Sequence, residues 1–227
     1  MFKIKVISTG SVGNSYLLSD EAGETLILDA GVRAADIKKA LDYDFSKVSG
    51  VLISHTHKDH SLSADDLLLY GLDVWKPYMI EGGKDRRTFG KYAVQSFDVP
   101  HGDYACCGFY IRHMNGFKML YLTDLEYCKY NFRKQEVNTI LIECNWQKEY
   151  VNTEAHNYQH KVLDHMSFDA CKGFVEANVT DKLRSVVLCH QSNFTCDINE
   201  CVRGIQEIVT DNVNVDFAEK GKEIKLI

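Results

Sequence analysis

Apolar residues along the chain alternate with clusters of polar and turn-forming residues, which predicts many short strands and a few helices. Strands are expected where hydrophobic positions alternate or run together, and helices where they recur with helical spacing. The pattern predicts strands at residues 2–8, 15–18, 24–28, 51–53, 92–99, 109–111, 118–122, 137–142, 185–189, 213–218 and 223–226. It predicts helices at residues 34–41, 61–69, 168–177 and 198–209, with Ser63 and Ser167 as the caps of the second and third.

The strand predicted at residues 51–53 leads into a loop with the pattern His-x-His-x-Asp-His. Imidazole and carboxylate are ligands of zinc, manganese and iron, and a strand end is a place where side chains can converge. His55 and His57, the first pair, project to one side of an extended chain, whereas Asp59 and His60, the second pair, follow as the chain turns. One ion does not easily take all four, which favours two neighbouring metals. The alternatives are a solvated histidine-rich loop and a single structural zinc, which usually recruits cysteine pairs that are absent here.

Length and composition favour one domain spanning residues 1–227. With 227 residues and 45% hydrophobic content, the chain can bury a substantial core. It begins with no charged-then-apolar leader and contains no apolar run near the roughly 20 residues that a membrane helix needs. We therefore expect a cytoplasmic protein that makes no use of a membrane.

Charge and cysteine usage narrow the functional classes. The eight cysteines form no Cys-x-x-Cys pair and lie mostly in apolar segments, so reduced, buried thiols are expected instead of disulfides. The formal net charge of −6 argues against a broad surface that binds nucleic acid without regard to sequence. It does not exclude a nuclease with a metal centre, because two divalent ions supply the local positive charge that a phosphate needs.

The loop at residues 55–60, directly after an apolar strand, resembles the signature of the metallo-β-lactamase fold superfamily. The turn at residues 9–14 is similar to a segment of the WalJ-like, or YycJ-type, group of that superfamily. The segments at residues 143–145 and 164–167 resemble further motifs of the same group, so the resemblance covers nearly the whole chain. It implies an α/β fold, the four-layer αβ/βα sandwich, in which two central sheets are each covered by helices.

The resemblance also implies a complete set of metal ligands. His101, at a predicted strand end, would join the first pair, and His190, at another, would join the second pair. Asp124 would bridge both ions, which makes chemical sense because one carboxylate partly neutralises two divalent charges. Asp59 and Asp124 are the expected catalytic residues, and Asp29 would orient the metal-binding loop without touching metal, unless it is only a cap or turn residue. The expected ligands are His55, His57, Asp59, His60, His101, Asp124 and His190.

Three residues are candidates for contact with substrate: Asn14, His165 and Asn193. The small residues before Asn14 would let the backbone approach the metal centre, although an ordinary tight turn explains them equally well. His165 precedes a predicted helix, where it could meet a phosphate beside free backbone amides, or it could be structural. His156 and His160 would share one helix face, for which a solvated face is preferred over a metal site.

These features predict a metal-dependent hydrolase whose two divalent ions activate water. Zinc is the first expectation, with manganese and iron(II) as alternatives, because histidine and carboxylate suit all three. The WalJ-like resemblance points to a phosphodiesterase, and within that class to a DNA exonuclease that acts on single-stranded DNA. The alternatives are hydrolysis of a small ester, lactone or thioester at the same centre, and a non-catalytic metal-binding protein. The sequence does not indicate an oligomeric state.

Overall fold

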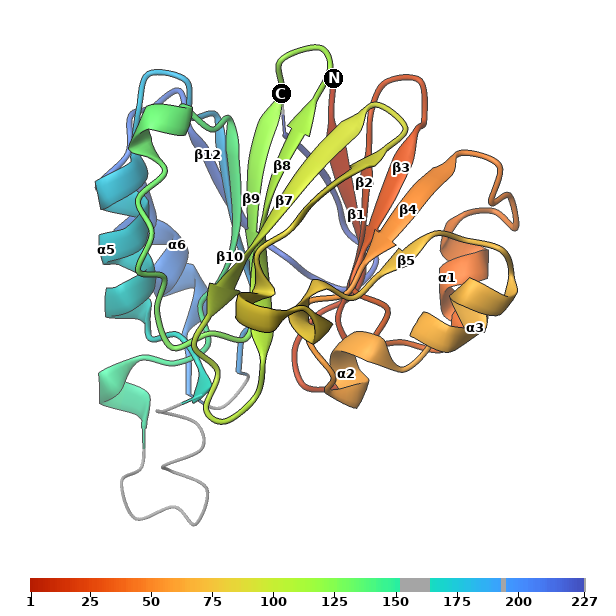
Figure 1. The fold of residues 1–227 in the computed structure, drawn as a ribbon. Coiled ribbons are helices and arrows are strands. Elements are labelled where there is room, and N and C mark those ends of the chain that lie inside the picture. Colours follow the sequence, from red (N-terminus) through yellow and green to blue (C-terminus); the bar gives the residue numbers. More distant parts are fainter. Residues whose placement is uncertain (152–163, 193–194, 227) are drawn as a thin grey trace.

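Two β-sheets lie face to face in the computed structural model, which describes residues 1–151, 164–192 and 195–226, and helices cover the outer face of each sheet (Figure 1). The first sheet has the strand order β13-β1-β2-β3-β4-β5, and the second has the order β12-β11-β10-β9-β8-β7-β6. The first comprises β1 (Lys3–Ser8), β2 (Ser15–Ser19), β3 (Thr25–Leu28), β4 (Val48–Leu52), β5 (Val74–Trp75) and β13 (Glu223–Lys225). The second comprises β6 (Arg86–Phe89), β7 (Tyr92–Val99), β8 (Cys106–His113), β9 (Lys118–Leu122), β10 (Thr139–Glu143), β11 (Ser185–Cys189) and β12 (Asn214–Phe217).

Three hydrophobic cores, each lying between two of the four layers of secondary structure, hold these elements together. The first core lies between the inner faces of the two sheets, where the rings of Tyr16 and Tyr121 meet edge to face with 5.9 Å between their centroids. The second core lies between the second sheet and two helices, α5 (Phe168–Asn178) and α6 (Ile198–Gln206). The third core lies between the first sheet and the two helices that contribute Ile37 and Leu67. Those helices are α1 (Ala34–Ala40) and α3 (Ala64–Leu69). This arrangement confirms the expected four-layer sandwich.

Strand direction brings several chain segments to one edge of the sandwich. In the first sheet β3 and β4 are parallel, and in the second β9, β10 and β11 are parallel. Because β8 is antiparallel to both β7 and β9, the end of β7 lies at the same edge as the end of β9. The short helix α2 (Lys58–Ser61) lies at this edge, at the opposite end of the molecule from both termini (Figure 1).

The structure corrects the helix predicted at residues 61–69. That segment is divided between α2 and α3, and Ser63, at the N-cap position of α3, makes no side-chain cap. Its hydroxyl instead donates to the carbonyl oxygen of Val32, a tertiary contact that sequence spacing does not reveal. The cap predicted for α5 is confirmed, because Ser167 Oγ accepts a hydrogen bond from Ala170 N at 3.1 Å.

Short 3-10 turns complete the described chain, and the sequence pattern missed β5 and β6. The turns are Pro77–Met79, Glu81–Gly83, Arg133–Gln135 and Lys148–Tyr150. The missed strands have simple reasons: β5 has two residues, and three of the four residues of β6 are exposed, so neither carries an apolar alternation. Among the helices of the described residues, none combines the length and the apolar character required to cross a membrane.

Candidate metal centre

Polar residues follow the ends of strands in both sheets and meet at the edge marked by α2. Asp29, Asp124 and His190 come directly or almost directly after β3, β9 and β11, with φ angles of 56°, 46° and 52°. This left-handed conformation costs a residue other than glycine about 1–2 kcal/mol, so contacts elsewhere must hold each of them in place. Asp124 and His190 belong to the two ligand clusters described next, and Asp29 contacts the loop that carries His60.

Four side chains form the first cluster: His55, His57, His101 and Asp124. One ligand atom from each lies within 4.8 Å of the others. His101 Nε2 is 3.2 Å from His57 Nδ1, and Asp124 Oδ2 is 3.5 Å from His55 Nε2 and 3.8 Å from His101 Nε2. A tetrahedral zinc ion with bonds near 2.0–2.1 Å separates its nitrogen ligands by about 3.3 Å. The cluster therefore has the dimensions of a metal site.

The second cluster contains Asp59, His60, His190 and the same Asp124, again with ligand atoms within 4.8 Å. Asp124 Oδ1 lies 3.2 Å from His60 Nε2 and 3.2 Å from His190 Nε2. Asp59 Oδ2 lies 3.6 Å and 3.8 Å from the same two nitrogens. Asp124 thus turns one carboxylate oxygen toward each cluster, and the sequence-predicted ligands come together in the two expected groups.

Four of the histidines use Nδ1 for an outer contact, which leaves Nε2 directed at the clusters. A proton on Nδ1 gives Nε2 the free lone pair that a metal requires, and it fixes the orientation of the ring. The outer partners are Ser54 Oγ for His55 (3.0 Å), Asp29 Oδ2 for His60 (2.7 Å), the Asp164 carbonyl oxygen for His101 (2.7 Å) and Glu143 Oε1 for His190 (2.9 Å).

Two of these Nε2 atoms, those of His55 and His190, are buried and make no hydrogen bond with any described residue. A buried polar atom without a partner costs about 1–3 kcal/mol, and a bound cation would remove that cost. Burial lowers the pKa of His55 well below its usual value, so its ring is in the neutral, metal-binding form. For His190 the effect of burial is outweighed by Asp124, Asp59 and Glu143, which raise its pKa to about 10. Metal binding must therefore displace a proton from His190.

Asp29 holds the loop of the two clusters from behind. Its Oδ1 accepts from Ser54 N at 2.7 Å, and its Oδ2 accepts from Ser54 Oγ at 2.9 Å and from His60 Nδ1 at 2.7 Å. The hydroxyl of Tyr121 also donates to Oδ2. Asp29 belongs to neither cluster, and its contacts fix His60 and the first turn of the loop, as an orienting residue would.

Glu143 has a larger part in the centre than the sequence indicated. It is fully buried at the end of β10, and its Oε1 accepts from Nδ1 of both His165 (2.8 Å) and His190 (2.9 Å). Its Oε2 accepts from the backbone of Leu125 at 2.8 Å and of Met166 at 3.4 Å. The sequence does place this carboxylate at the end of a predicted strand. Only the strand order shows that this strand, β10, lies between β9, which Asp124 follows, and β11, which His190 follows.

Glu143→Gln is expected to weaken metal binding at the second cluster. Whichever way the amide is turned, its NH2 group faces an N–H donor, either that of His190 or that of Leu125. Loss of such an outer partner typically costs about 10- to 100-fold in metal affinity or activity. Titration of the metal-free protein with zinc measures the effect, with the exposed Glu223→Gln as control and thermal unfolding as a check on folding. Unchanged affinity for both ions would contradict this role.

The three substrate candidates have different outcomes. Asn14 is fully buried, and its side chain bonds to Gly10 and to the Asp59 carbonyl oxygen and contacts His60 Nε2 at 2.8 Å. Asn14 therefore supports the loop of the second cluster, and its contact with substrate stays a prediction. The His165 side chain is 14% exposed and stacks on His190 at 5.2 Å between ring centroids. Asn193 and the histidines at positions 156 and 160 lie outside the described residues.

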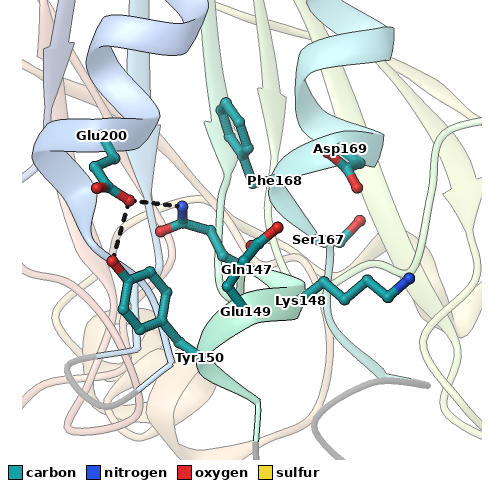
Figure 2. Close-up of a pocket in the computed structure, with 8 residues that line it drawn as sticks. All are labelled: Gln147, Lys148, Glu149, Tyr150, Ser167, Phe168, Asp169 and Glu200. Atoms are coloured by element: carbon teal, nitrogen blue, oxygen red, sulfur yellow. Dashed lines mark hydrogen bonds between the residues drawn. The ribbon is translucent and has the colours of Figure 1, made fainter.

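A cavity of about 800 Å³ opens beside the second cluster. Its wall includes His165, His190 and Asn145, the turn at residues 8–12, and Lys220. A smaller cavity of about 440 Å³ lies at the start of α5, where Glu200 accepts hydrogen bonds from Gln147 Nε2 and Tyr150 Oη (Figure 2). The smaller cavity contains no member of either cluster, whereas the cavity of about 800 Å³ is lined by His190, so this larger cavity of the two is the candidate substrate site.

Comparison with known proteins gives similarities along most of the chain. A family model described as "Anti-Pycsar protein Apyc1" matches residues 6–71. The chain is 25% identical over 219 residues to "Exodeoxyribonuclease YycJ" of Bacillus anthracis, covering 82% of this chain and 81% of that protein. It is 24% identical over 223 residues to "Exodeoxyribonuclease WalJ" of Streptococcus pneumoniae, covering 84% and 82%.

Among solved structures, the metallo-β-lactamase fold protein YhfI from Bacillus subtilis superposes with a TM-score of 0.71 at 15% identity, covering 99% of this chain and 100% of that chain. This likeness shows that the two chains share a fold. The chain has the metallo-β-lactamase fold, and along most of its length its sequence is similar to the proteins named YycJ and WalJ.

Proposed function

We propose that this protein is a metal-dependent phosphodiesterase that holds two divalent ions and degrades DNA from an end. The observation that carries the proposal is the position of Asp124, whose two carboxylate oxygens face the two clusters of histidine and carboxylate ligands. Its relatives named YycJ and WalJ are exodeoxyribonucleases, which supports DNA as the substrate class. Histidine and carboxylate ligands favour zinc, with manganese and iron(II) as the other candidates.

The proposed chemistry requires an activated water. Two bound ions would supply it by lowering the pKa of a water toward about 7 and by polarising a phosphoryl oxygen. The chain's own part is to hold the ligands still, because each buried imidazole is oriented through Nδ1 and both Asp124 oxygens are directed inward. This preorganisation is what makes electrostatic stabilisation effective in an active site.

Asp59 is the proposed proton acceptor for the attacking water. It is the most exposed carboxylate of the two clusters, with 27% of its side chain accessible. Burial would raise the pKa of Asp59, but the neighbouring rings of His190 and His60 lower it below its usual value. The carboxylate is therefore ionised at neutral pH and can orient a water or accept its proton.

The substrate would lie in the larger cavity, next to the second cluster. His165 lines this cavity, and Glu143 fixes the orientation of its ring through Nδ1, so the ring is placed where it would meet a phosphate oxygen. Glu143 also raises the pKa of His165 against the effect of burial, which favours the positively charged ring. Lys220 adds a positive charge to the wall, and the small residues at positions 9–11 allow close approach of a nucleotide.

The test is degradation of 5′-labelled single-stranded DNA in Mn²⁺ or Zn²⁺, with wild type beside Asp59→Ala purified in the same way. Wild type is expected to release short products or mononucleotides from linear DNA and to leave circular single-stranded DNA intact, because an exonuclease needs an end. Asp59→Ala is expected to bind DNA but to leave it uncut. A wild-type protein that holds two ions and cuts no DNA would contradict the proposal and favour a small ester or lactone as substrate.

A further inference from the structure

A group of cysteines lies apart from the two histidine clusters. All eight cysteines of the chain are free, and three of them, Cys144, Cys196 and Cys201, bring their sulfur atoms within 4.8 Å of one another. The Cys196 and Cys201 sulfurs are 3.5 Å apart. A fourth thiol, that of Cys171, is outside this group but close enough to Cys144 to raise the pKa of Cys144. Reduced thiols were expected from the sequence, but their convergence at one point was not.

The four cysteines come from different elements on the outer side of the second sheet. Cys144 directly follows β10, Cys171 lies in α5, Cys201 lies in α6, and Cys196 precedes α6. Three of them are fully buried, whereas Cys196 is partly exposed and lines the larger cavity. The cavity gives an ion a path from solvent to the sulfurs, which a site enclosed by the core would lack.

We infer that Cys144, Cys171, Cys196 and Cys201 form a separate thiolate site for a zinc ion. A tetrahedral zinc with Zn–S bonds near 2.3 Å separates its sulfur ligands by about 3.8 Å. The Cys196 and Cys201 sulfurs are 3.5 Å apart, and the Cys144 sulfur lies within 4.8 Å of both; Cys171 would complete the set as the fourth ligand. Soft thiolates select zinc over magnesium, manganese and calcium.

This site would join the loop after β11 to the end of β10, next to the second histidine cluster. Cys144 stands between Glu143, which holds His190 through Nδ1, and Asn145, whose Nδ2 donates to the His190 carbonyl oxygen at 2.9 Å. An ion held by Cys144 and Cys196 would therefore stiffen the support of His190. The inference concerns a structural ion and does not depend on the reaction at the histidine clusters.

Cobalt(II) distinguishes the two kinds of site, because only thiolate ligands give a strong sulfur-to-metal charge-transfer band. Metal-free, reduced full-length protein is titrated with cobalt(II) chloride without oxygen, and the band is expected to saturate at one ion per chain. It is expected to persist in Asp124→Asn, which alters the histidine clusters, and in Cys128→Ser, which removes another partly exposed thiol. Cys196→Ser and Cys196→Ala are expected to weaken the band and the affinity for this ion, because only three thiolates remain.

Two results would overturn the inference. One is a wild-type protein without the band, whether its thiols stay free or Cys196 and Cys201 join in a disulfide. The other is an undiminished band in both Cys196 variants. Thermal unfolding of each variant in chelator shows that it is folded, so that a weaker band reports a missing ligand.

Discussion

Asp124→Asn is expected to abolish hydrolysis and to weaken the binding of both metal ions at once. The two carboxylate oxygens lie 3.2–3.8 Å from the nitrogens of His55, His60, His101 and His190, so one substitution reaches both clusters. An amide keeps the shape of the side chain but loses the charge that offsets two divalent cations. The loss of activity should exceed the roughly 10- to 100-fold cost of removing an outer partner.

The asparagine variant separates this effect from misfolding. Asp124 has a φ of 46°, and asparagine is among the few residues that adopt the left-handed conformation readily. The variant should therefore fold, and Asp98→Asn, a partly exposed carboxylate in β7, is the matched control. Metal content and kcat/KM are measured for both. Asp124→Asn with two tightly bound ions and near-normal turnover would contradict a bridging position.

Gly31→Ala is expected to displace the loop that carries Asp59 and His60. A Cβ atom at Gly31 would lie 1.6 Å from the Asp59 carbonyl oxygen and 2.6 Å from His60 N, both of them backbone atoms. The same segment is tied down by Ala30 N, which donates to the His60 carbonyl oxygen at 2.8 Å. Because the added methyl cannot be avoided by a side-chain rotation, α2 must shift away from β3.

The expected result is loss of the second ion, loss of activity, and destabilisation by about 1–3 kcal/mol or more, the usual cost of overpacking a core. Gly173→Ala in α5 is the control, since no atom lies within 4 Å of its added Cβ and alanine favours a helix by roughly 1 kcal/mol. Metal content and unfolding of both variants are compared. If the Gly31→Ala protein binds two ions and has the same free energy of unfolding as wild type, the backbone of Gly31 does not lie as close to α2 as described here.

The sequence indicated the centre because its ligands follow strongly apolar strands. The loop at residues 55–60 was dense enough to predict two metals from spacing, and His101, Asp124 and His190 each follow a strand that the apolar pattern predicted. Parallel strands then explain why these distant residues meet.

The parts that the sequence could not supply depend on contacts between distant segments. The Ser63 hydroxyl donates to the Val32 carbonyl oxygen and does not cap α3, and the predicted helix is divided in two near this residue. Asn14 turns inward to the loop of the second cluster, and Glu143 gains its role only when β10 lies between β9 and β11. The cysteine group escaped notice because its members are scattered in sequence without a metal-binding spacing.

Anomalous diffraction from crystals grown with Mn²⁺ tests the central claim most directly, because it locates ions without assuming an activity. We expect two peaks about 3.5–4 Å apart, as in two-metal hydrolases, one beside each carboxylate oxygen of Asp124. The first should lie among His55, His57 and His101, and the second among Asp59, His60 and His190. A single peak, or two peaks that Asp124 does not join, would contradict the account.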